Sequence, residues 1–213
     1  MILNNTIYMK PIQALLFDLG GVIVNLDYHK TINAFESIGL KEAEFLYNQF
    51  SQSEVFDDFE IGSLSAKEFI NLMKNQISIH SSESEIKKAW NAMILGFEEV
   101  KLEKIKRYSE NIPCYLLSNT NEIHLEYIQN ILGEMPFKNL ESLFNKCYYS
   151  HIIGKRKPHK ETFEWVLNDM GYAPEDVLFI EDSPQHIEGA KKINLNTLYF
   201  TNERSLDDIE SWL

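Results

Sequence analysis

A carboxylate stands where an apolar run of the chain ends abruptly. Asp18 follows the strand-like segment Ile12–Phe17 and precedes the residues Leu-Gly-Gly. Such a run is typical of a buried strand, and open α/β folds bind their ligands at the carboxyl ends of strands. A carboxylate there can attack an electrophile such as phosphorus. Taken alone, an Asp before a Gly is also ordinary turn chemistry, so the role of Asp18 depends on its companions.

Three further polar side chains, Ser118, Lys157 and Asp182, lie at or just after the ends of other short apolar runs. Because parallel strands end at one edge of a sheet, these groups are expected to converge with Asp18. A hydroxyl and loop amides can hold phosphate oxygens, and a lysine can offset their charge. Two carboxylates with water and substrate oxygens suit Mg²⁺. The set predicts phosphoryl transfer, with Asp18 as nucleophile and Asp182 anchoring the metal.

The elements that must position these groups alternate between strands and helices. Strands are predicted at Ile12–Phe17, Cys114–Leu117, Cys147–Tyr149, Val177–Ile180 and Thr197–Phe200, and helices at Leu102–Tyr108, Ile123–Leu132, His159–Met170 and Ile187–Ile193. Alternation of this kind favours a parallel sheet with right-handed crossovers. The fold class is therefore α/β.

Residues 28–97 differ in character from the rest of the chain. They contain no convincing buried strand, and their apolar residues recur at helical spacing, as in Ile32, Phe35 and Ile38. We therefore predict an α-helical insertion at 28–97 in an α/β core formed by 10–27 and 98–213. Residues 1–9 are interpreted as an extension, which makes Met9 an alternative start.

The order of the motifs resembles the haloacid dehalogenase (HAD) superfamily. They read Phe-Asp-Leu-Gly-Gly-Val, Leu-Leu-Ser-Asn-Thr-Asn, Gly-Lys-Arg-Lys-Pro and Phe-Ile-Glu-Asp-Ser, and they span nearly the whole chain. The resemblance implies a Rossmann-like core with a C1-type helical cap. It also implies Asp18 as nucleophile, Ser118 and Lys157 on the phosphate, and Mg²⁺ on Asp18, Asp182 and the carbonyl of Gly20. The residues of these motifs are most similar to those of bacterial sugar-phosphate phosphatases, including phosphatases that act on glucose 1-phosphate.

Two positions depart from the pattern that this resemblance implies. Most phosphatases of the superfamily carry a second Asp two residues after the nucleophile, as general acid and base, and here Gly20 cannot transfer a proton. General acid–base help is typically worth about 10²–10⁴-fold, so we expect leaving groups that need little protonation, such as sugar 1-phosphates. His186 stands where an acid or Asn is common, and we interpret it as a helix-surface residue. Glu181 is expected to orient metal-bound water.

The residues around the motifs leave several interpretations open. Asn119 either offers its backbone N–H to phosphate or only fixes its loop. In the segment 56–62, Phe-Asp-Asp-Phe-Glu-Ile-Gly, acidic and aromatic residues either contact a sugar or form an ordinary amphipathic helix. Lys155 and Arg156 are expected to be solvated, and Tyr28 to lie in the core of the cap.

Composition limits the possible partners. The net charge of −12 argues against nucleic acid, whose phosphates call for clustered Lys and Arg. No stretch is long enough to span a membrane, no signal peptide is recognisable, and a cytoplasmic location is expected. Cys114 and Cys147 lack metal-ligand spacing and are expected to be free thiols. The oligomeric state stays open.

The sequence therefore predicts a Mg²⁺-dependent phosphatase acting on a small phosphorylated metabolite, with an aspartyl-phosphate intermediate. Three alternatives stay open. A phosphomutase normally needs the acid that Gly20 replaces, and a 2-haloacid dehalogenase would use Asp18 to attack carbon without a metal. A non-catalytic protein would keep the phosphate pocket without turnover.

Overall fold

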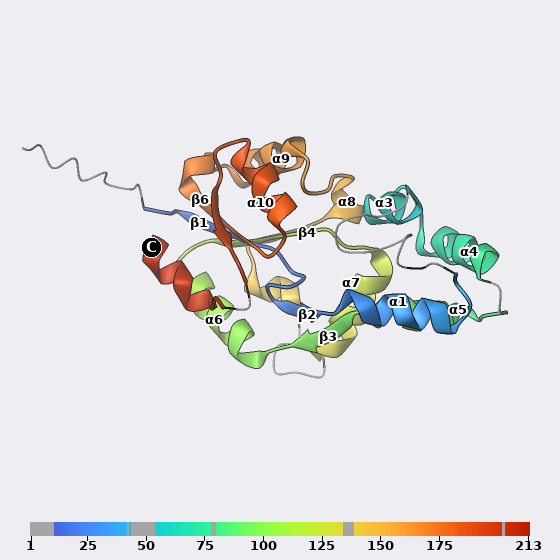
Figure 1. The fold of residues 1–213 in the computed structure, drawn as a ribbon. Coiled ribbons are helices and arrows are strands. Elements are labelled where there is room, and N and C mark those ends of the chain that lie inside the picture. Colours follow the sequence, from blue (N-terminus) through green and yellow to red (C-terminus); the bar gives the residue numbers. More distant parts are fainter. Residues whose placement is uncertain (1–10, 42, 44–53, 78–79, 134–138, 202) are drawn as a thin grey trace, which may run out of the picture.

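A five-stranded parallel sheet forms the centre of the molecule (Figure 1). The computed structural model describes residues 11–41, 43, 54–77, 80–133, 139–201 and 203–213. The strands are β1 (Ala14–Phe17), β4 (Cys114–Ser118), β5 (Lys146–Tyr149), β6 (Val177–Glu181) and β7 (Asn196–Tyr199), in the order β5-β4-β1-β6-β7. Each neighbouring pair is parallel, so the predicted α/β sheet is confirmed.

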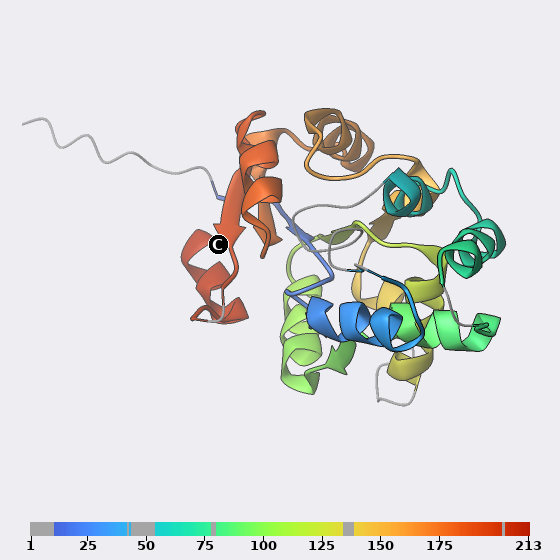
Figure 2. The same ribbon diagram turned by 45° about the vertical axis from the view of Figure 1, so that its right-hand side comes forward.

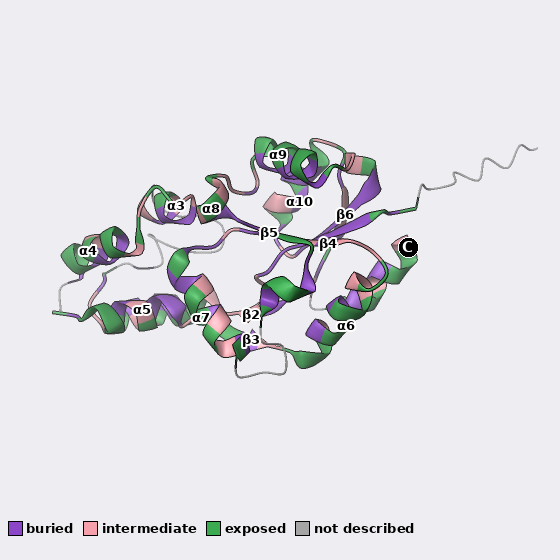
Figure 3. Cartoon of the chain, turned by 180° about the vertical axis from the view of Figure 1, so that it is seen from behind, coloured by how far each residue is buried: buried purple, intermediate pink, exposed green. Residues whose placement is uncertain are grey.

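Helices cover both faces of this sheet because side chains alternate along each strand. In β1, Leu15 and Phe17 enter the apolar cluster that includes residues of α6 (Glu99–Ser109), α7 (Glu122–Gly133) and the 3₁₀ segment η3 (Leu206–Trp212). Ala14 and Leu16 enter the other cluster, with α9 (Lys160–Met170) and α10 (Pro184–Lys191). Figure 3 shows the strands β4 and β6 largely buried between these layers. The short segments α8 (Ser150–Ile153), η1 (Leu140–Leu143) and η2 (Pro174–Asp176) lie in the connections.

Among the described residues between β2 and β3, four helices lie together beyond one end of the sheet (Figures 1 and 2). They are α1 (Tyr28–Ser37), α3 (Glu54–Glu60), α4 (Ala66–Gln76) and α5 (Glu83–Asn91). Capping boxes begin α4 at Ser65 and α5 at Ser82, where each serine accepts a hydrogen bond from the third helical residue. Stacked and edge-on contacts join Phe56, Phe59, Phe69 and Trp90 into an aromatic core.

The described part of 28–97 also contains a strand that the sequence interpretation missed. β3 (Ile94–Phe97) pairs antiparallel with β2 (Val24–Leu26), so the entry to the helical segment and its exit lie side by side. The run Ile94–Phe97 is short and includes Gly96, which gives too little alternation to distinguish a strand from a helix end. The boundary between core and cap at 27/28 and 97/98 stays a prediction.

Two other expectations can be compared with the structure. Cys114 is buried, Cys147 is partly buried, and both are free thiols, as predicted. None of the helices in the described ranges has the length and apolar character that crossing a membrane requires.

The helical segment contacts the sheet domain through main-chain atoms. Gly62, two residues after the end of α3, has φ +74°, and a Cβ built there would lie 2.2 Å from the carbonyl oxygen of His151 in α8. The Ala66 N–H at the start of α4 donates to Oε2 of Glu122 at the start of α7, at 3.3 Å. A side chain at position 62 would therefore force the two segments apart.

Gly62→Ala is expected to lower the free energy of unfolding by more than the roughly 1–3 kcal/mol that a positive φ alone costs a non-glycine residue. The matched control is Gly171→Ala. Gly171 has φ +79°, but a Cβ at that position would meet nothing within 4 Å, so only the conformational cost applies there. Urea denaturation of both variants measures the difference. Equal losses would contradict the close main-chain contact.

Candidate active site

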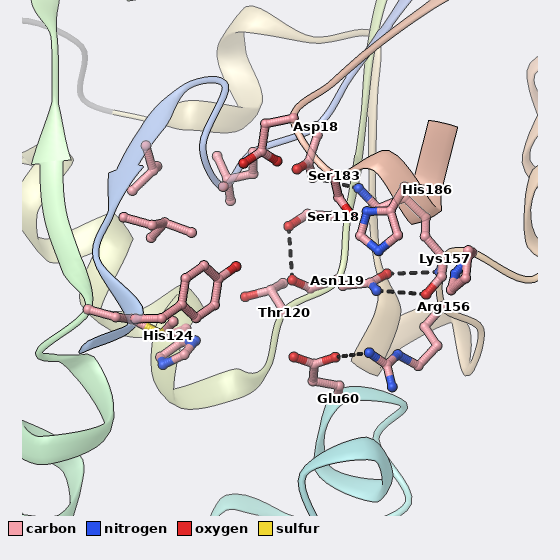
Figure 4. A pocket seen from close by; sticks show the side chains of 18 of the residues that line it. Asp18, Glu60, Ser118, Asn119, Thr120, His124, Arg156, Lys157, Ser183 and His186 are labelled. Carbon is pink, nitrogen blue, oxygen red and sulfur yellow. Dashed lines mark hydrogen bonds and ion pairs between the residues drawn. The ribbon is translucent and has the colours of Figure 1, made fainter. Parts of the chain in front are cut away.

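A cavity of about 380 Å³ opens at the carboxyl ends of β1, β4 and β6. Asp18, Ser118, Lys157 and Asp182 all line it, so the convergence predicted from four separate strand ends is correct. Figure 4 shows Asp18 and Ser118 on one side of this space, and Glu60 of α3 with Arg156 on the other. The cavity is thus enclosed jointly by the sheet and the helical segment.

Lys157 is held between two carboxylates. Its Nζ lies 2.7 Å from Oδ1 of Asp18 and 2.7 Å from Oε2 of Glu181, and its side chain has no exposed surface. Burial disfavours the charged form, but Asp18 and Glu181 outweigh that effect and keep the pKa of Lys157 above its ordinary value. The ammonium is therefore a fixed positive charge at the end of β1.

Glu181 positions its neighbours through both of its carboxylate oxygens. Its Oε2 contacts Lys157 and lies 3.0 Å from Nδ1 of His186, while its Oε1 accepts from the amides of Asp182 at 3.1 Å and Ser183 at 2.9 Å. Burial would raise the pKa of Glu181, yet Lys157 and His186 hold it well below its usual range. Both oxygens thus have protein partners, and the role of Glu181 in orienting metal-bound water stays a prediction.

Asp18 and Asp182 repel each other in this site. Burial, followed by the charge of Glu181, raises the pKa of Asp18 to about 7 despite Lys157. Burial and the charges of Asp18 and Glu181 raise the pKa of Asp182 to about 8. Carboxylate oxygens of these three residues lie within 4.8 Å of one another. Because these carboxylates repel one another, each makes it harder for the others to ionise. A hard divalent cation binds such closely spaced oxygen ligands well.

Gly21 and Gly20 shape the loop beside Asp18. Gly21 has φ +76°, and a Cβ there would lie 2.0 Å from Oδ2 of Asp182, so only glycine admits the carboxylate at this distance. At Gly20 a Cβ would lie 2.7 Å from Cδ1 of Leu26. Leu26 therefore occupies the space into which a side chain at position 20 would project.

Asn119 ties two loops together. Its Nδ2 donates to the carbonyl of Lys157 and its Oδ1 accepts from the backbone N–H of Lys157, both at 2.9 Å. The Asn119 side chain therefore fixes the loop, which agrees with one of the two interpretations of this residue. Ser118 is buried at the cavity wall, and its hydroxyl oxygen lies 3.4 Å from the carbonyl oxygen of Asn119.

Two expectations about exposure were wrong. His186 is not a helix-surface residue, because the first turn of α10 directs it to Glu181 and leaves 16% of its side chain exposed. Arg156 is not solvated. It forms ion pairs with Asp57 and, at 3.0 Å, with Glu60, and 19% of its side chain is exposed. The spacing of His186 from Glu181 gave a usable signal, whereas no local pattern relates Arg156 to α3.

The sequence interpretation did not predict that Tyr28 lines the cavity, and it left the role of segment 56–62 open. Tyr28, expected in the core of the cap, lines the cavity. Burial and the charges of Asp182 and Asp18 raise the pKa of its phenol well above the usual range. In segment 56–62, the acids Asp57 and Glu60 face the cavity, while Phe56 and Phe59 pack into the aromatic core.

A buried network joins α5 to α7 at the far wall. Asn121 accepts from Trp90 Nε1 at 3.2 Å and from the His124 amide at 3.0 Å, and its Nδ2 lies 3.2 Å from Nδ1 of His124. Because Asn121 Nδ2 can only donate, His124 carries its proton on Nε2, which donates to the Trp90 carbonyl at 3.1 Å. Burial lowers the pKa of His124 to about 4, so the imidazole is neutral.

His124 is expected to make stability depend on pH. Below the ordinary histidine pKa of about 6.5 the unfolded chain takes up a proton that the folded chain refuses until about pH 4. Stability is therefore lost as the pH falls through this window, by about 2 kcal/mol between pH 8 and pH 5 for this residue. Urea denaturation at both pH values is expected to show a correspondingly smaller loss in His124→Gln. The control His29→Gln, at an exposed position, should behave as the unmodified chain, and an unchanged loss in His124→Gln would contradict the network.

The fold and the site together define a haloacid dehalogenase-like hydrolase. The model of that family matches residues 12–194, and the chain belongs to it. A D-ribitol-5-phosphate phosphatase of Bacteroides thetaiotaomicron is 30% identical over 186 residues, covering 87% of this chain and 90% of that protein.

Solved structures give the same family. A point mutant of an HAD family enzyme from Bacteroides thetaiotaomicron, in complex with magnesium and inorganic phosphate, has a TM-score of 0.88 at 29% identity, covering 93% of this chain and 98% of that one. A predicted HAD-like family hydrolase of Porphyromonas gingivalis has a TM-score of 0.85 at 27% identity, covering 95% and 98%.

Proposed function

We propose that this chain is a Mg²⁺-dependent phosphatase that hydrolyses a small sugar phosphate or polyol phosphate. The observation that carries the proposal is the convergence of Asp18, Lys157 and Asp182 in one cavity. The similarity to a D-ribitol-5-phosphate phosphatase supports the reaction and the class of substrate. The magnesium and phosphate in the related structure support the cofactor and the bound group.

Asp18 and Asp182, with the Gly20 carbonyl, would hold Mg²⁺, which supplies charge neutralisation at the phosphate oxygens. The oxygen cluster fits this ion because a divalent cation would relieve the repulsion that raises the pKa of both aspartates. Lys157 adds a second positive charge, and its bond to Asp18 aims the carboxylate. Ser118 and the loop amides around Asn119 would bind the remaining phosphate oxygens.

The reaction would proceed in two displacements at phosphorus. A carboxylate oxygen of Asp18 forms the new P–O bond in line, the ester P–O bond breaks, and the leaving alcohol takes a proton from solvent because Gly20 offers none. Water then attacks the aspartyl-phosphate, which releases inorganic phosphate and restores Asp18.

Asp18→Asn is expected to reduce hydrolysis of p-nitrophenyl phosphate in Mg²⁺ by roughly a thousandfold or more, because the nucleophile is lost. Acid quenching with ³²P-labelled substrate should leave hydroxylamine-sensitive label on the unmodified chain and none on the variant. Circular dichroism checks that the variant is folded. Phosphate-ester binding without any turnover in the unmodified chain would instead support the non-catalytic alternative.

A second test restores an acid beside the nucleophile. Gly20→Asp combined with Leu26→Ala, which clears the space that Leu26 Cδ1 occupies, is expected to raise kcat on alkyl phosphates roughly tenfold over Leu26→Ala alone. Little gain is expected on p-nitrophenyl phosphate, whose leaving group needs no proton. Gly20→Asn with Leu26→Ala is the control of equal size. An equal gain with Asn, or on the aryl ester, would exclude proton transfer as the cause.

A further inference from the structure

The end of the cavity away from Asp18 has its own chemical character. Asp57 and Glu60 enter it from α3, and Arg156 enters from the loop before Lys157. Figure 4 shows Glu60 and Arg156 facing one another across from Asp18. If the phosphate is bound at Asp18, this end receives the leaving group.

The side chain of Glu60 is held in place. Glu60 is 5% exposed, and its Oε2 lies 3.0 Å from Nη2 of Arg156. A carboxylate so deeply buried stays charged only beside a compensating group, and Arg156 is that group. The Nε of Arg156 is also buried and has no hydrogen-bond partner among the described residues.

The charges at this end do not balance. Two carboxylates, Asp57 and Glu60, face one guanidinium, Arg156, so the formal charge of the three is −1. Apolar side chains, among them Leu26, Met93, Ile94 and Ile128, also line the cavity. A carboxylate accepts strong hydrogen bonds from hydroxyl groups, and a buried carboxylate repels a second anion.

We infer that Glu60, positioned by Arg156, is a specificity-determining residue that selects a neutral polyhydroxylated leaving group and rejects an anionic one. The inference rests on the proposed phosphatase activity and adds to it the class of leaving group. Hydroxyl groups of a polyol or sugar donate to the Glu60 carboxylate. A carboxylate or second phosphate in the same place meets a like charge.

The test uses two phosphates of equal length, a pentitol 5-phosphate and the corresponding pentonic acid 5-phosphate, which carries a carboxylate at its far end. The unmodified enzyme in Mg²⁺ is expected to show a kcat/KM at least about tenfold higher for the pentitol ester. In Glu60→Gln, which keeps the shape of the side chain, kcat/KM should fall about tenfold for the pentitol ester and rise about tenfold for the acid. p-Nitrophenyl phosphate has no hydroxyl groups, and its turnover should change less than about threefold, since only the weaker neutral contacts differ.

Two further variants make the result specific. Asp58→Asn removes the same charge from the same helix at an exposed position outside the cavity lining, and the ratio of the two substrates should not change. Arg156→Gln removes the counter-charge that keeps the buried Glu60 ionised, so the ratio of kcat/KM for the pentitol ester to that for the acid should fall, in the same direction as in Glu60→Gln.

Three results would overturn the inference. They are an unchanged substrate ratio in Glu60→Gln with aryl phosphatase activity intact, an equal change in Asp58→Asn, and a preference of the unmodified enzyme for the acid. If the unmodified chain hydrolyses no aryl phosphate in Mg²⁺, the proposed function fails and this inference fails with it. An active enzyme with an unchanged ratio overturns the inference alone.

Discussion

The buried ammonium of Lys157 is the interaction on which the rest of the site depends. A buried cation is stable only with opposite charges and hydrogen-bond acceptors around it, and Asp18 and Glu181 supply both. In return, the positive charge of Lys157 allows the carboxylates of Asp18 and Glu181 to lie close to that of Asp182. Asn119 fixes the backbone of the same lysine, so the loops after β1, β4, β5 and β6 are set by one another.

The cavity is electrostatically divided as a result. One end gathers a lysine and closely spaced carboxylates that suit a metal and a phosphate, and the other gathers two acids and an arginine. The two ends are built by different parts of the chain. The sheet supplies the end that binds the phosphate group, which all phosphate esters share. Helix α3 supplies the acids of the other end, which faces the leaving group, and leaving groups differ from one ester to another.

The features that the sequence predicted correctly are those with a local cause. Asp18, Ser118 and Asp182 end apolar runs, and such runs become parallel strands whose ends must meet. The environments of Arg156 and Tyr28 have no local cause, because they depend on how α3 and α1 pack against the sheet domain. The partners Arg156 and Asp57 are 99 residues apart, and neither sequence neighbourhood identifies the other. His186 differs, because its partner Glu181 lies on the strand just before α10, and that short spacing is a local signal.

The contact between Gly62 and the His151 carbonyl has a consequence for how such a protein can change over generations. The close approach of Gly62 to α8 depends on a missing side chain and a main-chain oxygen, and neither belongs to the residues that α3 presents to the cavity. Exchanges at Asp57 or Glu60 therefore leave that contact in place. A lineage with this architecture can acquire a new substrate by a few substitutions on one seven-residue helix, while the phosphate chemistry is inherited unaltered.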